Sequence, residues 1–218
     1  MTSEILKRII SSIILIPLAL FFIIKGSFYF ISFMILFFII SAYEWNNISN
    51  KKLYKIPGLI FLLISVYLTI IFRGNTNAEL FVFLIAISTC VTTDIGGYIF
   101  GKIFKGPKIN KKISPNKTYA GAIGGYLLSI ILVYIFIQNY YFLDSEPGNE
   151  FGKEEFFLIL LTSTISQIGD FIVSFFKRKS KVKNTGTILP GHGGLLDRTD
   201  GMIFALPFTY ILTIIFLN

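Results

Sequence analysis

The polar residues best suited to chemistry lie between positions 166 and 200. Gln167, Asp170, Ser174 and Lys177 are spaced three, four and three residues apart, so on a helix they share one face. The residues between them are apolar, which is typical of a lipid-embedded helix with one polar stripe. An aspartate at membrane depth costs about 2.5–3.5 kcal/mol on insertion scales, and it normally pairs, binds an ion or lines a wet cavity. We therefore interpret Asp170 as a functional residue.

The segment after this stripe, residues 177–201, is called the signature loop below. Its basic residues, with the chain's one histidine, are Lys177, Arg178, Lys179, Lys181, Lys183, His192 and Arg198. Its glycines are Gly186, Gly191, Gly193 and Gly194, and they leave backbone N–H groups unobstructed for a phosphate. The loop ends on two carboxylates, Asp197 and Asp200. Carboxylates for a divalent cation, bases for phosphate and glycines for close approach together indicate nucleotide chemistry at a membrane surface.

The spacing of these residues resembles the signature of the phosphatidate cytidylyltransferase family, also called CDP-diacylglycerol synthases. The positions in register are Ser174, Lys177, Arg178, Lys183, Gly186, Leu189, Pro190, His192, Gly193, Gly194, Asp197, Arg198 and Asp200. One position departs, because Asn184 stands where the family has Asp. A match of this length, with mixed residue types at fixed spacing, is far more specific than a lone glycine motif.

A second segment is similar to the same family, although less specifically. Its matching positions are Asp94, Gly96, Tyr98, Gly101, Lys102, Ser114, Pro115, Lys117, Thr118, Gly121 and Gly125. Helix packing alone would explain the glycines, since Gly97 and Gly101 form a small-xxx-small pair, but it would not explain Asp94. The resemblance covers roughly residues 90–205, which we predict to be the catalytic core of a single transmembrane domain, residues 1–218.

The resemblance implies an enzyme that transfers a cytidylyl group from CTP to phosphatidate and releases CDP-diacylglycerol and pyrophosphate. The catalytic residues that it implies are Ser174, Lys177, Arg178, Lys183, His192, Asp197, Arg198 and Asp200. The cofactor-binding residues, for the nucleotide, are Lys102, Ser114, Lys117, Thr118, Gly193 and Gly194. The implied cofactor is Mg²⁺, held by Asp170, Asp197 and Asp200, and a second cation such as K⁺ is left open.

Several of these residues also have a plainer interpretation. Asp170 could be only an ion-pair partner of Lys177 or Arg178, and the basic residues could serve only to orient the chain in the membrane. For His192, a backbone hydrogen bond in a turn explains the residue as well as phosphate contact or proton handling does.

Five other charged positions and one tryptophan are expected to interact with the membrane surface. We interpret Trp45 as a residue of the interfacial aromatic belt and Glu44 as its interfacial neighbour, in preference to a support for a basic loop. Attraction to anionic lipid is the favoured interpretation of Lys105, Lys108, Lys111 and Lys112.

Membrane helices must position these residues. The chain has 218 residues, of which 54% are hydrophobic, and its mean hydropathy is +0.72, well above the usual range of soluble domains. Seven apolar segments, each about long enough to span a bilayer, lie roughly at 9–24, 28–44, 57–72, 78–99, 119–137, 156–176 and 202–217. We therefore predict an all-α, polytopic helical bundle with about seven transmembrane helices.

The basic residues predict how this bundle is oriented. If the N-terminus and the loops at 45–56, 100–118 and 177–201 share one side, that side holds 17 of the 20 Lys and Arg residues. The positive-inside rule then makes the N-terminus and the signature loop cytoplasmic. We predict a multi-pass protein of the cell inner membrane whose active site faces the cytoplasm. Its expected partners are CTP, phosphatidate and the lipid bilayer, not nucleic acid; a homodimer is left open.

Two other functions stay open on the sequence. A CTP-dependent polyprenol or lipid kinase would attack the γ-phosphorus and release CDP, so product analysis separates it from a cytidylyltransferase. An anion transporter would use a broken, glycine-rich helix at half-depth and should show paired interrupted helices in two related halves. The sequence shows no such internal repeat.

Overall fold

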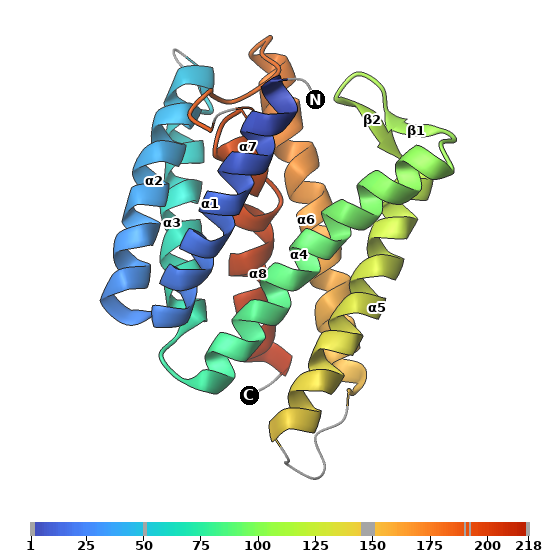
Figure 1. The fold of residues 1–218 in the computed structure, drawn as a ribbon. Coiled ribbons are helices and arrows are strands. Elements are labelled where there is room, and N and C mark those ends of the chain that lie inside the picture. The colour runs from blue at the N-terminus through green and yellow to red at the C-terminus, as the bar shows by residue number, and fades with distance from the viewer. Residues whose placement is uncertain (1–2, 50–51, 145–150, 190, 192, 217–218) are drawn as a thin grey trace.

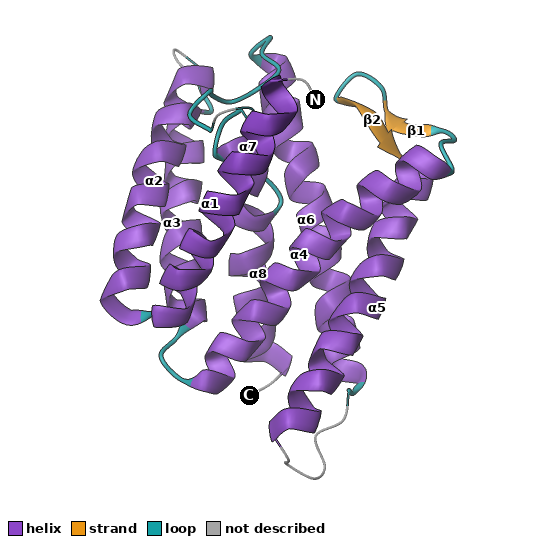
Figure 2. Ribbon diagram, viewed as in Figure 1, coloured by secondary structure: helices purple, strands orange, loops and turns teal. Residues whose placement is uncertain are grey.

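The computed structural model describes residues 3–49, 52–144, 151–189, 191 and 193–216. Its elements in chain order are α1 (Ser3–Lys25), α2 (Ser27–Ser49), α3 (Lys55–Arg73), α4 (Asn77–Ile103), β1 (Lys108–Asn110), β2 (Ser114–Thr118), α5 (Tyr119–Asp144), α6 (Lys153–Lys179), α7 (Leu196–Thr199) and α8 (Met202–Phe216). Figure 2 shows a bundle of helices with one small hairpin at its upper end.

Each of the seven apolar segments forms a helix. The helices that are long and apolar enough to cross a membrane are Ser27–Ser49, Lys55–Arg73, Asn77–Ile103, Tyr119–Tyr140 and Lys153–Lys179. Two shorter apolar helices, Ile10–Lys25 and Met202–Ile215, account for the remaining segments. The all-α, polytopic class is therefore confirmed, whereas the number of crossings stays a prediction.

The connection between α4 and α5 folds into a hairpin, where the sequence indicated only a basic loop. Strands β1 and β2 pair antiparallel, with Lys108 opposite Thr118 and Asn110 opposite Ser114. The side chain of Asn110 closes the turn by accepting hydrogen bonds from the N–H groups of Lys112 and Ile113 at 3.0 and 3.2 Å. A short two-stranded ribbon is only marginally stable alone, so its contacts with the bundle fix its position.

Helices α4 and α5 lie unusually close because glycines face each other. A Cβ added at Gly96 would lie 2.5 Å from the carbonyl oxygen of Gly124, and one at Gly121 would lie 2.7 Å from that of Gly97. Only glycine allows backbones to approach this closely, the arrangement expected of small-xxx-small positions in membrane helices. Gly97 and Gly101, the pair predicted to pack, face Gly121 of α5, whereas the closest backbone approaches of the two helices are at Gly96 and Gly121.

Buried hydroxyl groups fix α6 between its neighbours. Thr93 on α4 donates to Ser163 on α6 at 2.8 Å, and Thr162 on α6 shares a 2.8 Å hydrogen bond with Thr209 on α8. Each such bond between membrane helices contributes on average about 0.6 kcal/mol. Together they set the rotation of α6, the helix with the polar stripe.

The loops gather at two ends of the bundle. The start of α1, the hairpin and the signature loop lie at one end, which we call the basic end, and the C-terminus lies at the other (Figure 1). This grouping agrees with the one used to predict the topology.

At the opposite end, a buried arginine closes the turn between α1 and α2. Arg73 is only 5% exposed. Its guanidinium donates hydrogen bonds of 2.9 Å to the carbonyl oxygens of Ile23, Ile24 and Gly74. These acceptors include carbonyls at the end of α1, which lack partners within the helix.

Candidate active site

The polar stripe of α6 faces a cavity. Gln167, Asp170 and Lys177 line a space of about 800 Å³. Ser174, on the same stripe, donates to Asp170 Oδ1 at 3.2 Å. The spacing of these residues therefore correctly predicted one shared polar face.

Five parts of the chain enclose this cavity at the basic end: the last turns of α4, the hairpin, the start of α5, α6 and the segment around α7. The carboxylates in its wall are Asp94, Asp170, Asp197 and Asp200. The cationic side chains in its wall are Lys102, Lys105, Lys108, Lys117, Lys177 and Arg198. Such a mixture of charges suits a polyphosphate together with a cation.

Lys177, near the end of α6, contacts the two carboxylates at the far end of the signature loop. Its ammonium group lies 3.0 Å from Asp197 Oδ1 and 3.5 Å from Asp200 Oδ2, and the residue is only 7% exposed. Because these carboxylates follow Lys177 by 20 and 23 residues, the pairing folds the whole loop back over α6. Three residues of the predicted site are thus brought together.

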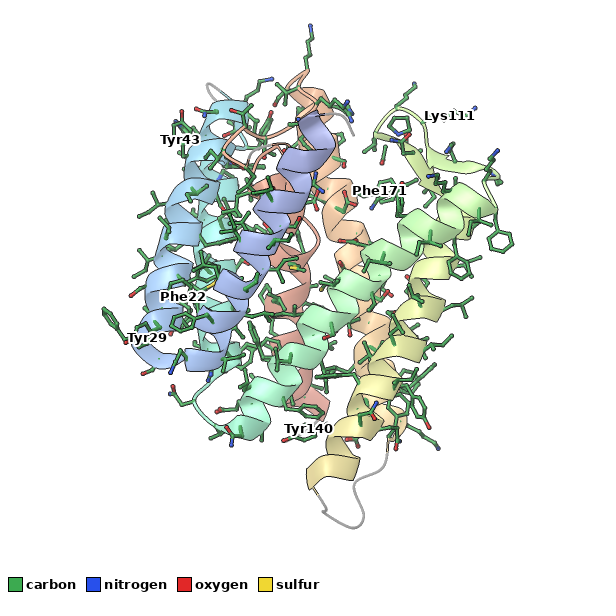
Figure 3. All side chains as sticks on the ribbon, in the orientation of Figure 1. Phe22, Tyr29, Tyr43, Lys111, Tyr140 and Phe171 are labelled. Carbon is green, nitrogen blue, oxygen red and sulfur yellow. The ribbon has the colours of Figure 1, made fainter. Side chains whose placement is uncertain are left out.

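A second ion pair joins the hairpin to α6. Lys117 on β2 forms a salt bridge with Asp170, and its ammonium group also lies 4.7 Å from the ring centroid of Phe171. Figure 3 shows Phe171 on the side of α6 that faces the hairpin. The plainer alternative, in which Asp170 pairs with Lys177 or Arg178, is therefore wrong, because Lys117 of the hairpin is its ion-pair partner.

Negative charge accumulates around Asp200. Burial raises the pKa of this carboxyl group well above its ordinary value, and the neighbouring carboxylates of Asp170 and Asp94 raise it further, while Lys177 opposes the shift. The carboxyl groups of Asp170 and Asp200 also contact each other, which raises the pKa of Asp200 again. Carboxylates that crowd in this way favour the binding of a cation between them.

The donor set suits a hard divalent cation. Oxygen ligands from carboxylates are those that Mg²⁺ prefers, and Asp170 and Asp200 already face each other. Asp197 is more fully engaged, since its Oδ2 accepts the N–H groups of Thr185 and Gly194 at 2.8 and 2.9 Å. Within the described residues, no three His, Cys, Asp or Glu side chains surround one position by themselves. A bound cation would therefore share the carboxylates with Lys117 and Lys177.

Other residues of the predicted site lie outside the cavity wall. Arg178 donates to the carbonyl oxygens of Ile113 and Val182, both at 3.2 Å, so it fastens the hairpin and the loop to the end of α6. Lys183 is exposed on the loop. Gly193 and Gly194 are absent from the described wall of the cavity. His192 lies outside the described residues.

The hairpin lysines separate into two pairs. Lys105 and Lys108, which we had assigned to lipid attraction, line the cavity. Lys111 and Lys112 are exposed and are absent from its described wall; Figure 3 shows Lys111 at the outer end of the hairpin. The hairpin separates these pairs, because Lys105 precedes β1 and Lys108 lies opposite Thr118, whereas Lys111 and Lys112 lie in the turn between the strands.

Two interfacial interpretations are wrong. Glu44 is fully buried and accepts hydrogen bonds from Thr185 Oγ1 at 2.8 Å and from the N–H groups of Leu195 and Leu196 at 2.9 and 3.0 Å. Trp45 is 6% exposed, and its indole N–H donates to the carbonyl oxygen of a residue at the start of α3 at 3.1 Å. Both side chains turn into the bundle instead of toward the membrane surface. For Glu44, the one sequence signal of a buried position was an acidic residue in an apolar run.

The fold and the cavity define a class of protein. Helices able to cross a membrane enclose, at one end, a site of carboxylates and basic side chains suited to phosphorylated substrates. This is a membrane-embedded enzyme of phosphate chemistry.

Comparison with known proteins gives the family. The profile of the Cytidylyltransferase family matches residues 6–79 and 59–216, and the chain belongs to this family. A protein of Rickettsia bellii (strain RML369-C) named phosphatidate cytidylyltransferase is 32% identical over 228 residues, covering 99% of this chain and 93% of the relative. A protein of the same name from Staphylococcus haemolyticus (strain JCSC1435) is 37% identical over 184 residues, covering 81% of this chain and 66% of the relative.

Proposed function

We propose that the protein transfers the cytidylyl group of CTP to phosphatidate and produces CDP-diacylglycerol and pyrophosphate. One observation supports this above all: four carboxylates and six cationic side chains line a single cavity at one end of a bundle of apolar helices. A lipid substrate with an anionic headgroup and a nucleoside triphosphate both need such a place. The relatives named phosphatidate cytidylyltransferase support the choice of these two substrates.

The reaction requires two anions to meet. An oxygen of the phosphatidate phosphate attacks the α-phosphorus of CTP, a new P–O bond forms, and the bond to the oxygen that bridges to the β-phosphorus breaks. The departing pyrophosphate takes the electron pair. Since phosphatidate is already ionised, no base has to remove a proton, and His192 has no obligatory role in proton transfer. The main task of the site is to offset charge and align the reactants.

The basic side chains of the cavity perform that task. Lys177 is held between two carboxylates, which orient its ammonium group toward the space where the phosphates meet. Arg198 and Lys117 line the same space and neutralise the triphosphate. The hydroxyl group of Ser114 donates to a phosphate oxygen, while Ser174 acts indirectly by holding Asp170.

Asp170, Asp197 and Asp200 would contribute to holding Mg²⁺, although among the described residues no three acidic side chains surround one position by themselves. When bound, such an ion offsets charge on the attacking and leaving oxygens. The chain prepares two of these ligands in advance: Ser174 donates to Asp170, and two backbone N–H groups of the signature loop donate to Asp197.

We further propose that this end of the bundle faces the cytoplasm, where nucleoside triphosphates are found.

The decisive test is product analysis with purified protein in lipid–detergent micelles. CTP labelled at either the α- or the γ-phosphate is incubated with phosphatidate, with and without Mg²⁺. We expect the α-label in a lipid product and the γ-label in pyrophosphate, with Mg²⁺ required for both. Transfer of the γ-label to lipid would instead identify a kinase, and the absence of any labelled lipid would reject the proposal.

A further inference from the structure

We infer that Glu44 is a positioning residue of the active site: from α2 it holds the signature loop in the shape that directs Asp197, Arg198 and Asp200 into the cavity. The inference rests on the proposed function only where activity is the measurement. Glu44 itself is absent from the described wall of the cavity, so it acts through the loop and not on the substrate.

The burial of Glu44 needs an explanation. A fully buried carboxylate is costly unless its oxygens receive hydrogen bonds. Among the described residues, Glu44 accepts three hydrogen bonds, from Thr185, Leu195 and Leu196, all in the signature loop and 141–152 residues away in sequence. Both carboxylate oxygens are used, Oε1 by Leu195 and Oε2 by the other two donors. The Glu44 carboxylate therefore stabilises the signature loop.

Glu44 and Asp197 bind the same two parts of the loop. Thr185 donates its hydroxyl group to Glu44 and its backbone N–H to Asp197 Oδ2. At the other part, Gly194 donates to Asp197 while Leu195 and Leu196 donate to Glu44. Because the donors alternate between the two carboxylates, a shift of the loop away from Glu44 would also move Asp197. Asp197 Oδ1 would then lose its contact with Lys177.

Two signature glycines provide an independent observation. A Cβ added at Gly186 would lie 2.7 Å from Glu44 Oε1, and one at Gly194 would lie 2.5 Å from Glu44 Oε2. Any side chain at either position would push the carboxylate away from the loop. At these two positions, glycine leaves room for the Glu44 carboxylate beside the backbone of the signature loop. This requirement is separate from phosphate binding.

The test is Glu44→Gln. Glutamine keeps the size of the side chain, but its amide NH₂ must face at least one backbone N–H, so one loop contact becomes repulsive. We expect kcat for CDP-diacylglycerol formation to fall roughly tenfold to a hundredfold, the range for a residue that orients site groups indirectly. The KM values for CTP and phosphatidate should change less, within about threefold, because Lys108 and Lys117 line the cavity from the hairpin and do not depend on the loop.

Glu79→Gln is the matched control. Glu79 also accepts three hydrogen bonds, from Asn75 N, Thr76 N and Thr76 Oγ1, but through Oε2 alone, so a glutamine oxygen can replace it. Glu79 lies in the first turn of α4, at the end of the helix opposite the cavity. The control variant should keep the wild-type kcat.

Limited trypsin digestion tests the loop without reference to activity. Lys181 and Lys183 are exposed on it, and we expect cleavage there to become several-fold faster in Glu44→Gln but not in Glu79→Gln. Wild-type cleavage rates in Glu44→Gln would overturn the inference, as would a wild-type kcat. If wild-type protein makes no CDP-diacylglycerol, the proposed function fails while the digestion still decides the role of Glu44.

A milder variant covers the case in which Glu44→Gln does not fold. Thr185→Val keeps the shape of the side chain and removes one of the three bonds to Glu44. We expect a smaller fall in kcat and a smaller rise in loop cleavage. No change in either measurement would reject the positioning role.

Discussion

Asp197 and Asp200 differ in what they bind, although both contact Lys177. Asp197 accepts two backbone N–H groups as well as the lysine, whereas Asp200 accepts Lys177 and the N–H of Gly201 and also faces Asp170. Asp197 therefore determines the shape of the loop, and Asp200 adds negative charge to the cavity. Removing one partner of a buried ion pair typically costs about 3–5 kcal/mol, so neither carboxylate should be dispensable.

The substitution Asp197→Asn tests the first of these roles. Asparagine keeps one oxygen but loses the charge that holds Lys177, and we expect turnover to fall by about a hundredfold or more, as for loss of a preorganised charged group. Insertion should be unchanged, since Asp197 lies in the short helix α7, outside the helices long enough to cross a membrane. Initial rates and the yield of detergent-extracted protein measure the two effects. Near-native turnover at ordinary Mg²⁺ would contradict the assignment of Asp197 as a metal ligand.

The hairpin lysines allow a paired comparison. Lys108 lines the cavity, and Lys111 is an exposed residue of the same hairpin. A single exposed ionic contact contributes up to about 1 kcal/mol, so Lys108→Gln should raise the KM for CTP by about fivefold at low salt. Lys111→Gln should leave it unchanged. Equal effects of the two substitutions would show that the lysines act only through the general charge of the membrane surface.

At the scale of elements, the hairpin, α4 and α5 form one unit. Thr118 ends β2, and its hydroxyl oxygen accepts the N–H of Gly121 at 3.0 Å, which caps the start of α5. The glycine contacts then hold α5 against α4. Asp94 and Lys117 are thereby placed on walls of one cavity, although 23 residues separate them in the sequence.

The substitution Gly121→Ala tests this close contact. Its new Cβ would lie 2.7 Å from the carbonyl oxygen of Gly97, and overpacking of this kind costs about 1–3 kcal/mol. We expect a lower midpoint of thermal unfolding in detergent. Gly97→Ala is the matched control, because its Cβ would lie 3.7 Å from the Gly121 carbonyl oxygen, an ordinary contact. Equal midpoints for the two variants would exclude a critical approach at Gly121.

Periodic features could be predicted from the sequence, and long-range contacts could not. Apolar runs determined the helices, and the spacing of Gln167, Asp170 and Lys177 identified the polar face. The role of Glu44 depends on partners more than 140 residues away, and such pairing leaves no periodic signal. Arg178 shows the converse, since it matches the signature yet binds backbone carbonyls outside the cavity wall.

At the scale of the whole molecule, the signature loop, which is near the end of the sequence, is held by residues near its beginning. Besides Glu44, Ser180 donates to the carbonyl oxygen of Ile48 on α2 at 2.5 Å, and its hydroxyl group lies 2.9 Å from that of Tyr54. The first helices are thus structural partners of the loop, even though the family signature lies outside them.

The orientation in the membrane can be tested by cysteine labelling. Cys90 is buried and is replaced by Ala, after which single cysteines are introduced at Lys105, Lys183 or Lys153. With the basic end in the cytoplasm, an impermeant thiol reagent added to intact cells should label only the cysteine at 153. Labelling at 105 or 183 from outside would overturn the predicted topology, and permeabilised cells control for reactivity.

The burial of Arg73 changes the number of basic side chains that are exposed at the end opposite the basic end. The predicted topology assigns Lys25, Arg73 and Lys153 to the side opposite the basic end, and the Arg73 guanidinium donates hydrogen bonds to three carbonyl oxygens. A cation buried among these dipoles is poorly accessible to lipid headgroups and counterions. Two exposed lysines then remain on that face, against 17 basic residues assigned to the other. In the folded protein, lipid headgroups and counterions therefore meet a larger difference in exposed basic residues between the two ends than residue counts indicate.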